Sequence, residues 1–331
     1  MTNFWQDKRV LVTGAGGFIG SHLTEALLHS GAQVRAFVRY NARNDPGLLR
    51  FLPRPDFDAL DILTGDLRDP DAVRQAVTGV SHVFHLGALI AIPYSYQHPV
   101  EVVESNIIGT LNVLLAARDF EVERLVHTSS SEVYGSALRV PIDEEHPLQG
   151  QSPYSASKIG ADKLAESFYC SYNLPVVTLR PFNTFGPRQS ARAVIPTMIS
   201  QALSGDTIRL GNLDTRRDFT YVSDTVDGFL KIAETPGVEG QTINLGTGHD
   251  VRIGDLAEQI VAMLDHPVDI VVEPHRLRPE KSEVQRLISD NRLALERLGW
   301  RPQVDINTGL RHTLDWIREN LSEYTTDRYV V

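Results

Sequence analysis

The first 180 residues alternate short apolar runs with longer amphipathic segments. The apolar runs predict strands within residues 10–12, 33–39, 61–66, 82–86, 124–128 and 176–180. The amphipathic segments predict helices at residues 21–30, 71–78, 100–118 and 155–172. Strands that alternate with helices imply a parallel sheet that is covered on both faces. We therefore expect an α/β protein with a doubly wound sheet of the Rossmann type.

The second half of the chain has a less regular pattern. Residues 180–217 are rich in Gly, Pro and Arg. Apolar residues recur at helical spacing between 253 and 264, which predicts a helix, and a strand is expected at 268–272. Trp300 and Trp316 lie in apolar contexts, and we expect both to pack a small lobe.

These patterns and the length of 331 residues predict two units. Residues 1–180 are expected to form a dinucleotide-binding domain, to which a segment at about 218–250 returns. Residues 181–217 and 251–331 are expected to form a smaller substrate-binding lobe. No flexible linker separates the two, so we expect them to share an interface.

The sequence GAGGFIG at residues 14–20 lies between the first predicted strand and the first predicted helix. In this context Gly14 allows a tight turn, Gly17 lets backbone amides approach a pyrophosphate, and Gly20 lets helix and strand pack closely. The free amides and the dipole at the helix N-terminus then stabilise the phosphates. The loop therefore predicts a dinucleotide site.

Tyr154 and Lys158 are four residues apart at the start of a predicted helix, so their side chains share one face. A tyrosine has a pKa of about 10 and acts as a base near neutral pH only if that pKa is lowered. The Lys158 ammonium and the helix N-terminus both favour the phenolate. The pair therefore predicts proton transfer, with Lys158 also able to hold the nicotinamide ribose.

The glycine loop, the Tyr-x-x-x-Lys pair and the serine-rich segment 128–135 together resemble the extended short-chain dehydrogenase/reductases that act on nucleotide sugars. The resemblance covers nearly the whole chain. It is nearest to the NAD-dependent 4,6-dehydratases of legionaminic acid biosynthesis, through residues 89–96, 147–154 and 186–196. That group is associated with nucleotide-linked N-acetylglucosamine, so the resemblance implies this substrate.

The resemblance implies a tightly bound and recycled NAD or NADP. The expected cofactor contacts are Gly14, Gly17, Phe18, Ile19, Gly20, Arg39, Asp66, Leu67, Leu86, Tyr154 and Lys158. Asp66 resembles the acid that contacts the adenine amino group. The strand at 33–39 lacks the acid typical of NAD binding, and Arg39 can accept a 2′-phosphate, stack on adenine or face solvent. The choice between NAD and NADP therefore stays open.

The resemblance also implies four catalytic residues, which are Ser130, Glu132, Tyr154 and Lys158. Ser130 would hydrogen-bond the sugar oxygen that is oxidised. In 4,6-dehydratases the sugar is oxidised at C4, water is lost across C5 and C6, and the hydride returns to C6. Glu132 would be the base that removes the C5 proton. Ser131 replaces the aspartate of the dTDP-glucose branch and matches the GDP-mannose branch better.

A dehydratase of an NDP-hexose or NDP-N-acetylhexosamine is the leading hypothesis. A UDP-sugar or UDP-uronate 4-epimerase is an alternative that needs no role for Glu132. UDP-glucuronate decarboxylases carry Thr-Ser-Glu at this place and are a third hypothesis. A non-catalytic redox sensor that binds NAD(P) belongs to a different class, and the complete set of Ser130, Tyr154 and Lys158 disfavours it.

The formal net charge of −10 argues against binding to a nucleic acid polymer or to an anionic membrane. It does not exclude one diphosphate, because a few arginines can bind it bidentately. The expected substrate contacts are Ser130, Ser131, Asn183, Arg188, Arg192, Arg217 and Arg278. The resemblance assigns Arg217 and Arg278 to the diphosphate, whereas Arg188 and Arg192 are weaker candidates.

The single cysteine, Cys170, excludes a disulfide within the chain and a thiolate metal cluster. His82 and His85 lie three apart on a predicted strand and point to opposite faces, so no metal site is expected. The sequence shows no signal peptide, membrane span or lipidation pattern, and we expect a cytoplasmic enzyme. The resemblance implies a homodimer through helices 100–118 and 155–172.

Overall fold

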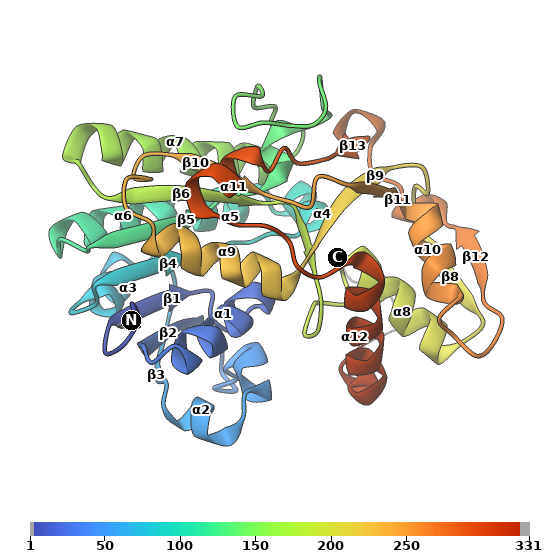
Figure 1. The fold of residues 1–331 in the computed structure, drawn as a ribbon, viewed down its shortest axis with the longest axis horizontal. Coiled ribbons are helices and arrows are strands. Elements are labelled where there is room, and N and C mark those ends of the chain that lie inside the picture. Colours follow the sequence, from blue (N-terminus) through green and yellow to red (C-terminus); the bar gives the residue numbers. More distant parts are fainter. Residues whose placement is uncertain (1–2, 325–331) are drawn as a thin grey trace.

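A seven-stranded parallel sheet forms the centre of the computed structural model, which describes residues 3–324 (Figure 1). The strand order is β10-β6-β5-β4-β1-β2-β3. Its strands are β1 (Arg9–Thr13), β2 (Gln33–Arg39), β3 (Asp61–Gly65), β4 (His82–His85), β5 (Arg124–Thr128), β6 (Val176–Pro181) and β10 (Thr242–Leu245). This sheet confirms the predicted α/β class, and six of its strands lie where the apolar runs predicted them.

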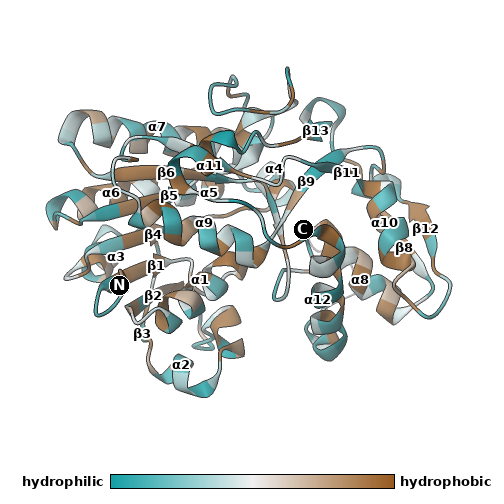
Figure 2. Cartoon of the chain, viewed as in Figure 1, coloured by the Kyte–Doolittle hydropathy of each residue, from teal (hydrophilic) through white to brown (hydrophobic). Residues whose placement is uncertain are grey.

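Helices cover both faces of this sheet. One face carries α1 (Phe18–His29), α9 (Val222–Glu234) and α11 (Arg292–Leu298), and the other carries α3 (Pro70–Val77), α6 (Gly109–Asp119) and α7 (Pro153–Tyr172). Successive residues of a strand point to opposite faces. Val10 and Val12 therefore pack under α1, whereas Leu11 packs in the core beneath α6. The central strands are largely apolar, as their brown colour in Figure 2 shows.

The long helix predicted at 100–118 is continuous but not uniform. It consists of α5 (Pro99–Val103), a π-helical segment (Glu104–Ile108) and α6. The π-helical segment places Asn106 so that its side chain bonds both the amide and the carbonyl of Leu89. By length and composition, Pro99–Asp119 could also cross a membrane, and half of its most apolar stretch is buried inside the protein.

The later segments build a second group of elements with its own core. One small sheet contains β7 (Asn183–Phe185), β9 (Arg216–Tyr221), β11 (Asp250–Arg252) and β13 (Arg286–Leu287), and a two-stranded sheet pairs β8 (Thr207–Leu210) with β12 (Asp269–Val272). The helices of this part are α8 (Val194–Ser204), α10 (Ile253–Val261) and α12 (Ile306–Glu319). Short helices elsewhere are α2 (Arg54–Asp58) and α4 (Ile92–Gln97).

The two tryptophans have different surroundings, and one expectation is wrong. Trp316 belongs to the core of the second group, as expected. Trp300 instead packs in the core of the main sheet, where its indole nitrogen donates to the Asp224 carbonyl at 2.8 Å. The segment after α11 returns to α9, and this long-range contact is not visible in the local apolar context of Trp300.

Candidate active site

The carboxyl ends of β1, β4 and β5 lie at the same edge of the parallel sheet. Ligands of open α/β sheets bind outside this edge. The glycine loop follows β1, Leu86 follows β4, and Ser130 comes two residues after β5. Sheet topology therefore brings together residues that are more than 100 positions apart in the chain.

The glycine loop has the geometry that close approach of a pyrophosphate requires. Gly14 has a φ of 71°, and the Gly17 amide donates to its carbonyl at 2.9 Å. A Cβ on Gly20 would lie 2.2 Å from the Gly14 carbonyl oxygen, so only glycine lets α1 start this close to β1. Gly17 caps α1 and is exposed, which leaves the first-turn amides of α1 available to an anion.

Residues after β3 and β4 line the same edge. Leu67 packs against Gly87, where an added Cβ would come within 2.7 Å of its side chain, and the Gly87 amide donates to the Thr13 hydroxyl at 3.1 Å. Asp66 is half-exposed and accepts from the Arg68 guanidinium at 2.7 Å. This hydrogen bond to Arg68 lowers the pKa of Asp66. The glycine loop and these neighbours fit a dinucleotide.

Arg39 ends β2 and does not stand free at the surface. Its guanidinium donates to the Glu101 carboxylate of α5 at 3.1 Å, and the Tyr94 hydroxyl bonds the same carboxylate. These bonds, that of Tyr94 first, lower the pKa of Glu101. A carboxylate on a neighbouring helix is thus paired with the cation that was expected to accept a 2′-phosphate.

Tyr154 and Lys158 occupy the first two turns of α7, and both are buried. Ser152 caps this helix through a reciprocal pair of hydrogen bonds with Ser155, an arrangement worth about 1 kcal/mol. The Lys158 ammonium donates to the Thr128 carbonyl at 2.6 Å. The Tyr154 hydroxyl is hydrogen-bonded with Ser130. The structure therefore brings together three of the four predicted catalytic residues.

The pKa of Tyr154 differs from the expectation. Burial raises it to about 12, and the hydrogen bond with Ser130 opposes this only in part. Burial also lowers the pKa of Lys158 to about 8. The expected lowering of the tyrosine pKa is thus not supplied by the protein's own groups, because desolvation disfavours the phenolate.

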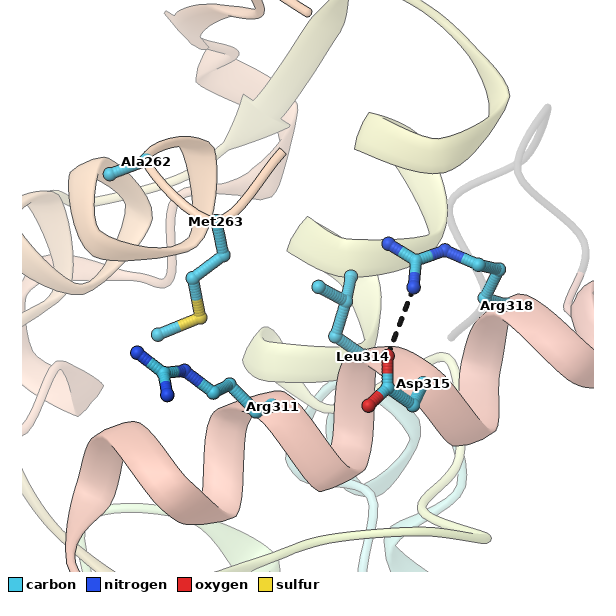
Figure 3. A pocket seen from close by; sticks show the side chains of 6 residues that line it. All are labelled: Ala262, Met263, Arg311, Leu314, Asp315 and Arg318. Atoms are coloured by element: carbon cyan, nitrogen blue, oxygen red, sulfur yellow. Dashed lines mark hydrogen bonds and ion pairs between the residues drawn. The ribbon is translucent and has the colours of Figure 1, made fainter. Parts of the chain in front are cut away.

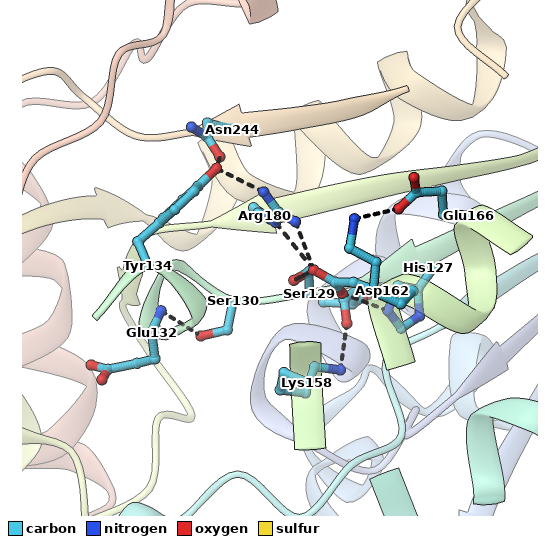
Figure 4. A network of polar contacts seen from close by, with 12 residues as sticks. His127, Ser129, Ser130, Glu132, Tyr134, Lys158, Asp162, Glu166, Arg180 and Asn244 are labelled. Atoms are coloured by element: carbon cyan, nitrogen blue, oxygen red, sulfur yellow. Dashed lines mark hydrogen bonds and ion pairs between the residues drawn. The ribbon is translucent and has the colours of Figure 1, made fainter. Parts of the chain in front are cut away.

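Glu132 lies on a 3-10 helix (Ser131–Tyr134) that directly follows Ser130. Its amide donates to the Ser130 hydroxyl at 3.2 Å, while its side chain is half-buried and extends away from Ser130 (Figure 4). Its charge interacts with the buried guanidinium of Arg217. Ser131 is buried beneath the same turn. The fourth predicted catalytic residue therefore faces toward the second half of the chain.

Arg217 and Arg278 come together, as the expectation of a diphosphate site requires. Arg217 of β9 lies 3.6 Å from the Glu283 carboxylate, and Arg278 lies 3.9 Å from it. Asn183 of β7 is next to β9 and donates weakly to the Asp218 carbonyl at 3.4 Å. Two cations thus lie on one side of Glu132.

Arg188 and Arg192 have other surroundings. Arg188 is nearly buried and pairs with Glu25 of α1 at 2.8 Å. Arg192 is exposed and contacts Ser190. Neither arginine is paired with Glu283, the residue that Arg217 and Arg278 share, among the ion pairs of residues 3–324. The structure therefore separates the two weaker candidates from the two stronger ones.

Sequence reasoning missed a buried polar network beneath the catalytic residues (Figure 4). Its centre is Asp162, which receives hydrogen bonds from Ser129, His127 and Arg180. Arg180 also donates to the Tyr134 hydroxyl. The one available signal was the position of Asp162 four residues after Lys158, which places it on the same face of α7.

A separate pocket lies between the end of α10 and α12 (Figure 3). It is lined by Ala262, Met263, Arg311, Leu314, Asp315 and Arg318. None of the predicted site residues lines it, so it is distinct from the site at the sheet edge.

Comparison with known proteins agrees with this geometry. Residues 11–313 match the family model described as GDP-mannose 4,6 dehydratase. The chain is 32% identical to a UDP-glucose 4-epimerase of Mycolicibacterium smegmatis over 94% of this chain and 98% of that one. It is also 32% identical to a dTDP-glucose 4,6-dehydratase of Streptomyces antibioticus, over 94% and 92%. Identity alone does not separate the two activities.

The solved structures include the dTDP-glucose 4,6-dehydratase DesIV of Streptomyces venezuelae with NAD and TYD bound. It superposes with a TM-score of 0.83 at 30% identity and covers 96% of this chain and 98% of its own. The chain belongs to the GDP-mannose 4,6-dehydratase family, among the extended short-chain dehydrogenase/reductases. It is an enzyme of this NAD-dependent group of nucleotide-sugar dehydratases and epimerases.

Proposed function

We propose that the protein is a nucleotide-sugar 4,6-dehydratase. The observation that carries this proposal is the position of Glu132, two residues after Ser130 and within electrostatic reach of Arg217. An epimerase needs only the groups that oxidise and reduce one carbon. Loss of water needs a second acid/base group on the other side of the sugar ring, and Glu132 supplies a carboxylate there.

Tyr154, Lys158 and Ser130 handle the proton of the sugar C4 hydroxyl. Tyr154 takes this proton, Ser130 donates a hydrogen bond to the same oxygen, and Lys158 would hold the nicotinamide ribose. The glycine loop would hold NAD⁺, which would supply the hydride acceptor and donor for the sugar and a positive charge that favours the phenolate of Tyr154. The residues hold the required positions because the capped start of α7 faces the end of β5.

Glu132 then acts on the oxidised sugar. A ketone at C4 acidifies the proton at C5, which the Glu132 carboxylate removes. The same group can pass the proton to the departing C6 hydroxyl, so that the proton and the hydroxide leave together as water. When the hydride arrives at C6, C5 takes up one proton, which balances the proton that Tyr154 took from the C4 hydroxyl. The buried guanidinium of Arg217 lies within electrostatic reach of Glu132.

The substrate proposed is an NDP-hexose or an NDP-N-acetylhexosamine. Its diphosphate would lie between Arg217 and Arg278, with Asn183 beside it, because these groups converge near Glu132. The ion pair with Glu25 makes Arg188 a residue that anchors the loop to α1. Residues 181–217 and 251–331 remain the proposed substrate-binding lobe, except that α11 and Trp300 pack in the core of the main sheet.

For the cofactor we propose NAD instead of NADP. The Glu101 carboxylate is bonded to Arg39 and would repel a 2′-phosphate that approached this guanidinium. The binding loop itself suits either nucleotide, since the pyrophosphate contacts are the same. The preference for NAD over NADP would therefore depend on the contact between Arg39 of β2 and Glu101 of α5.

A homodimer is the proposed assembly. Apolar side chains on the outer face of the 99–119 helix and of α7 are exposed, and these elements are packed against each other. They are Val100, Val103, Ile108, Tyr169 and Tyr172. Exposed apolar side chains on a pair of packed helices are typical of a surface that a second copy covers.

Incubation of the purified protein with GDP-, UDP-, CDP- and dTDP-sugars tests the reaction class by mass spectrometry. A dehydratase yields a product lighter by one water. Loss of carbon dioxide from a UDP-uronate would indicate a decarboxylase, and an unchanged mass with altered stereochemistry would indicate an epimerase. If the protein converts none of the sugars, all three assignments are wrong.

A further inference from the structure

Asp162 lies on the catalytic face of α7 but touches none of the proposed reacting groups. It is one turn after Lys158 and two turns after Tyr154, so the three side chains follow one another along one face of the helix. All three are buried. A buried carboxylate is retained only when hydrogen bonds and opposite charges compensate its loss of hydration.

Four donors from two strands provide this compensation (Figure 4). Asp162 Oδ1 bonds the His127 Nε2 at 3.0 Å. Its Oδ2 accepts from the Ser129 hydroxyl at 2.6 Å, and from the Arg180 Nη2 and Nε at 2.9 and 3.2 Å. His127 belongs to β5, Ser129 follows β5, and Arg180 belongs to β6. One carboxylate therefore ties α7 to two strands.

The hydrogen bonds from His127 and Ser129 to Asp162 fix the chain on both sides of Thr128, the residue that anchors Lys158. Thr128, whose carbonyl accepts from Lys158 at 2.6 Å, lies between His127 and Ser129 in the chain. Ser130 is the next residue. Any change at Asp162 that releases the end of β5 would move both Ser130 and the anchor of Lys158 relative to Tyr154.

Asp162 is the negative charge that balances the Lys158 ammonium, because the other titratable groups described around it are neutral or cationic. His85 of β4 and His127 of β5 face the ammonium, and burial lowers the pKa of both, so they are neutral near pH 7. Arg180 of β6 is a second cation. Although burial opposes it, hydrogen bonding, that of His127 first, lowers the pKa of Asp162 to about 2.

We propose that Asp162 is a positioning residue, which fixes the end of β5 against α7 and supplies the negative charge that balances Lys158. This inference rests on the proposed function, because it assigns Asp162 a role in the same proton transfer. Asp162 acts through Lys158 and Ser130, and it does not contact the sugar.

The test compares Asp162→Asn with two control variants. Ser129→Ala removes one hydrogen bond to Asp162 but leaves its charge. Asp227→Asn removes an aspartate that pairs with Lys231 at 3.0 Å, also four residues apart on a helix, but at the surface. For each protein, kcat and KM are measured from pH 6 to 10 with the nucleotide sugar that the wild type converts, together with Tm and the Kd of NAD⁺.

We expect Asp162→Asn to lower kcat at least tenfold with little change in KM. Removing the anion lowers the pKa of Lys158, which burial holds at about 8, so the alkaline limb of the kcat profile should move to lower pH by at least half a unit. Ser129→Ala should lose stability without this movement, and Asp227→Asn should behave as wild type. A folded Asp162→Asn protein whose kcat and pH limbs equal those of the wild type would overturn the proposal.

Two further measurements keep the result decisive. If Asp162→Asn does not fold, the double variant Asp162→Asn/Arg180→Gln removes both charges and is compared in the same way, with unchanged pH limbs again counting against the proposal. If the wild type converts no nucleotide sugar, the proposed function fails by itself. The pH dependence of NAD⁺ binding then tests Asp162, because its alkaline limb should still move downward in the variant and would stay in place if Asp162 were only structural.

Discussion

At the scale of single residues, Glu132 separates the proposed dehydratase from an epimerase. Replacement by Gln keeps the size of the side chain and its position after Ser130, but removes the base. We expect Glu132→Gln to lower the rate of water loss by at least 10²-fold, within the range of general acid–base catalysis. The Kd of NAD⁺ should change less than twofold, since the Glu132 side chain extends away from Ser130 and its charge interacts with Arg217 (Figure 4).

A control and an isotope measurement sharpen this prediction. Glu166→Gln changes an exposed glutamate of α7 that pairs only with Lys163 in the described contacts, and it should retain full activity. In Glu132→Gln, oxidation at C4 can still occur, so slow hydride transfer from a C4-deuterated sugar to NAD⁺ should remain detectable. Unimpaired water loss in Glu132→Gln would remove this residue from the mechanism.

The choice of cofactor is also made by single residues. Glu101→Gln removes the negative charge beside Arg39 but preserves a hydrogen-bond acceptor for Tyr94. We expect the Kd of NADP⁺ to fall about tenfold, equivalent to about 1.4 kcal/mol, while that of NAD⁺ stays within twofold. Glu104→Gln, on the same helix and close to Arg68, is the matched control. Wild-type protein that binds NADP⁺ more tightly than NAD⁺ would contradict the prediction.

At the scale of elements, the close contact between α1 and the glycine loop should limit what position 20 accepts. In Gly20→Ala the new methyl group would lie 2.2 Å from a backbone oxygen, which cannot move aside as a flexible side chain can. Overpacking of this kind typically costs 1–3 kcal/mol. We expect Tm to fall by several degrees and the Kd of NAD⁺ to rise at least tenfold, as seen by thermal unfolding and titration calorimetry.

Gly205→Ala provides the comparison for this variant. A Cβ at Gly205 would come no closer than 4.0 Å to its nearest neighbour, and its φ is −169°, which any residue adopts. Its Tm and its affinity for NAD⁺ should match those of the wild type. Equal NAD⁺ binding by Gly20→Ala and Gly205→Ala would show that α1 is not held as closely as the structure indicates.

The elements of the central sheet were predictable because each strand is a buried apolar run between turn signals. β2 and β5 were predicted at their observed bounds, and β1, β4 and β6 to within one residue. One strand of the smaller sheets, expected at 268–272, is observed as β12. Others were missed, because β9, for example, begins Arg-Arg-Asp and is buried by partners that come from distant segments. Such strands are defined by tertiary pairing and not by their own hydrophobicity.

The candidate site was predictable to the same extent. Tyr154, Lys158 and the glycines of residues 14–20 were predictable because their spacing can be recognised in the sequence alone. The role of Asp162 was not predictable, because it depends on contacts with His127 and Arg180. These two residues lie 35 and 18 positions away in the sequence, and the sheet brings them next to Asp162. The separation of Arg188 from Arg217 was also not predictable from the sequence, because it depends on the distant carboxylate that each arginine meets, Glu25 for Arg188 and Glu283 for Arg217.

At the scale of the whole molecule, the apolar helix face defined by Val100, Val103, Ile108, Tyr169 and Tyr172 predicts the assembly. Val100 is 69% exposed in the single chain, so burying its side chain against a second copy would stabilise a dimer relative to the monomer. We expect light scattering after size-exclusion chromatography to give twice the chain mass of 36.8 kDa.

Val100→Glu combined with Ile108→Glu should place like charges in the interface and yield the single-chain mass. Leu138→Glu changes an equally exposed apolar residue on a loop outside this face and should leave the dimer intact. A wild-type protein that elutes with the single-chain mass at micromolar concentration would show that this face is not a dimer interface.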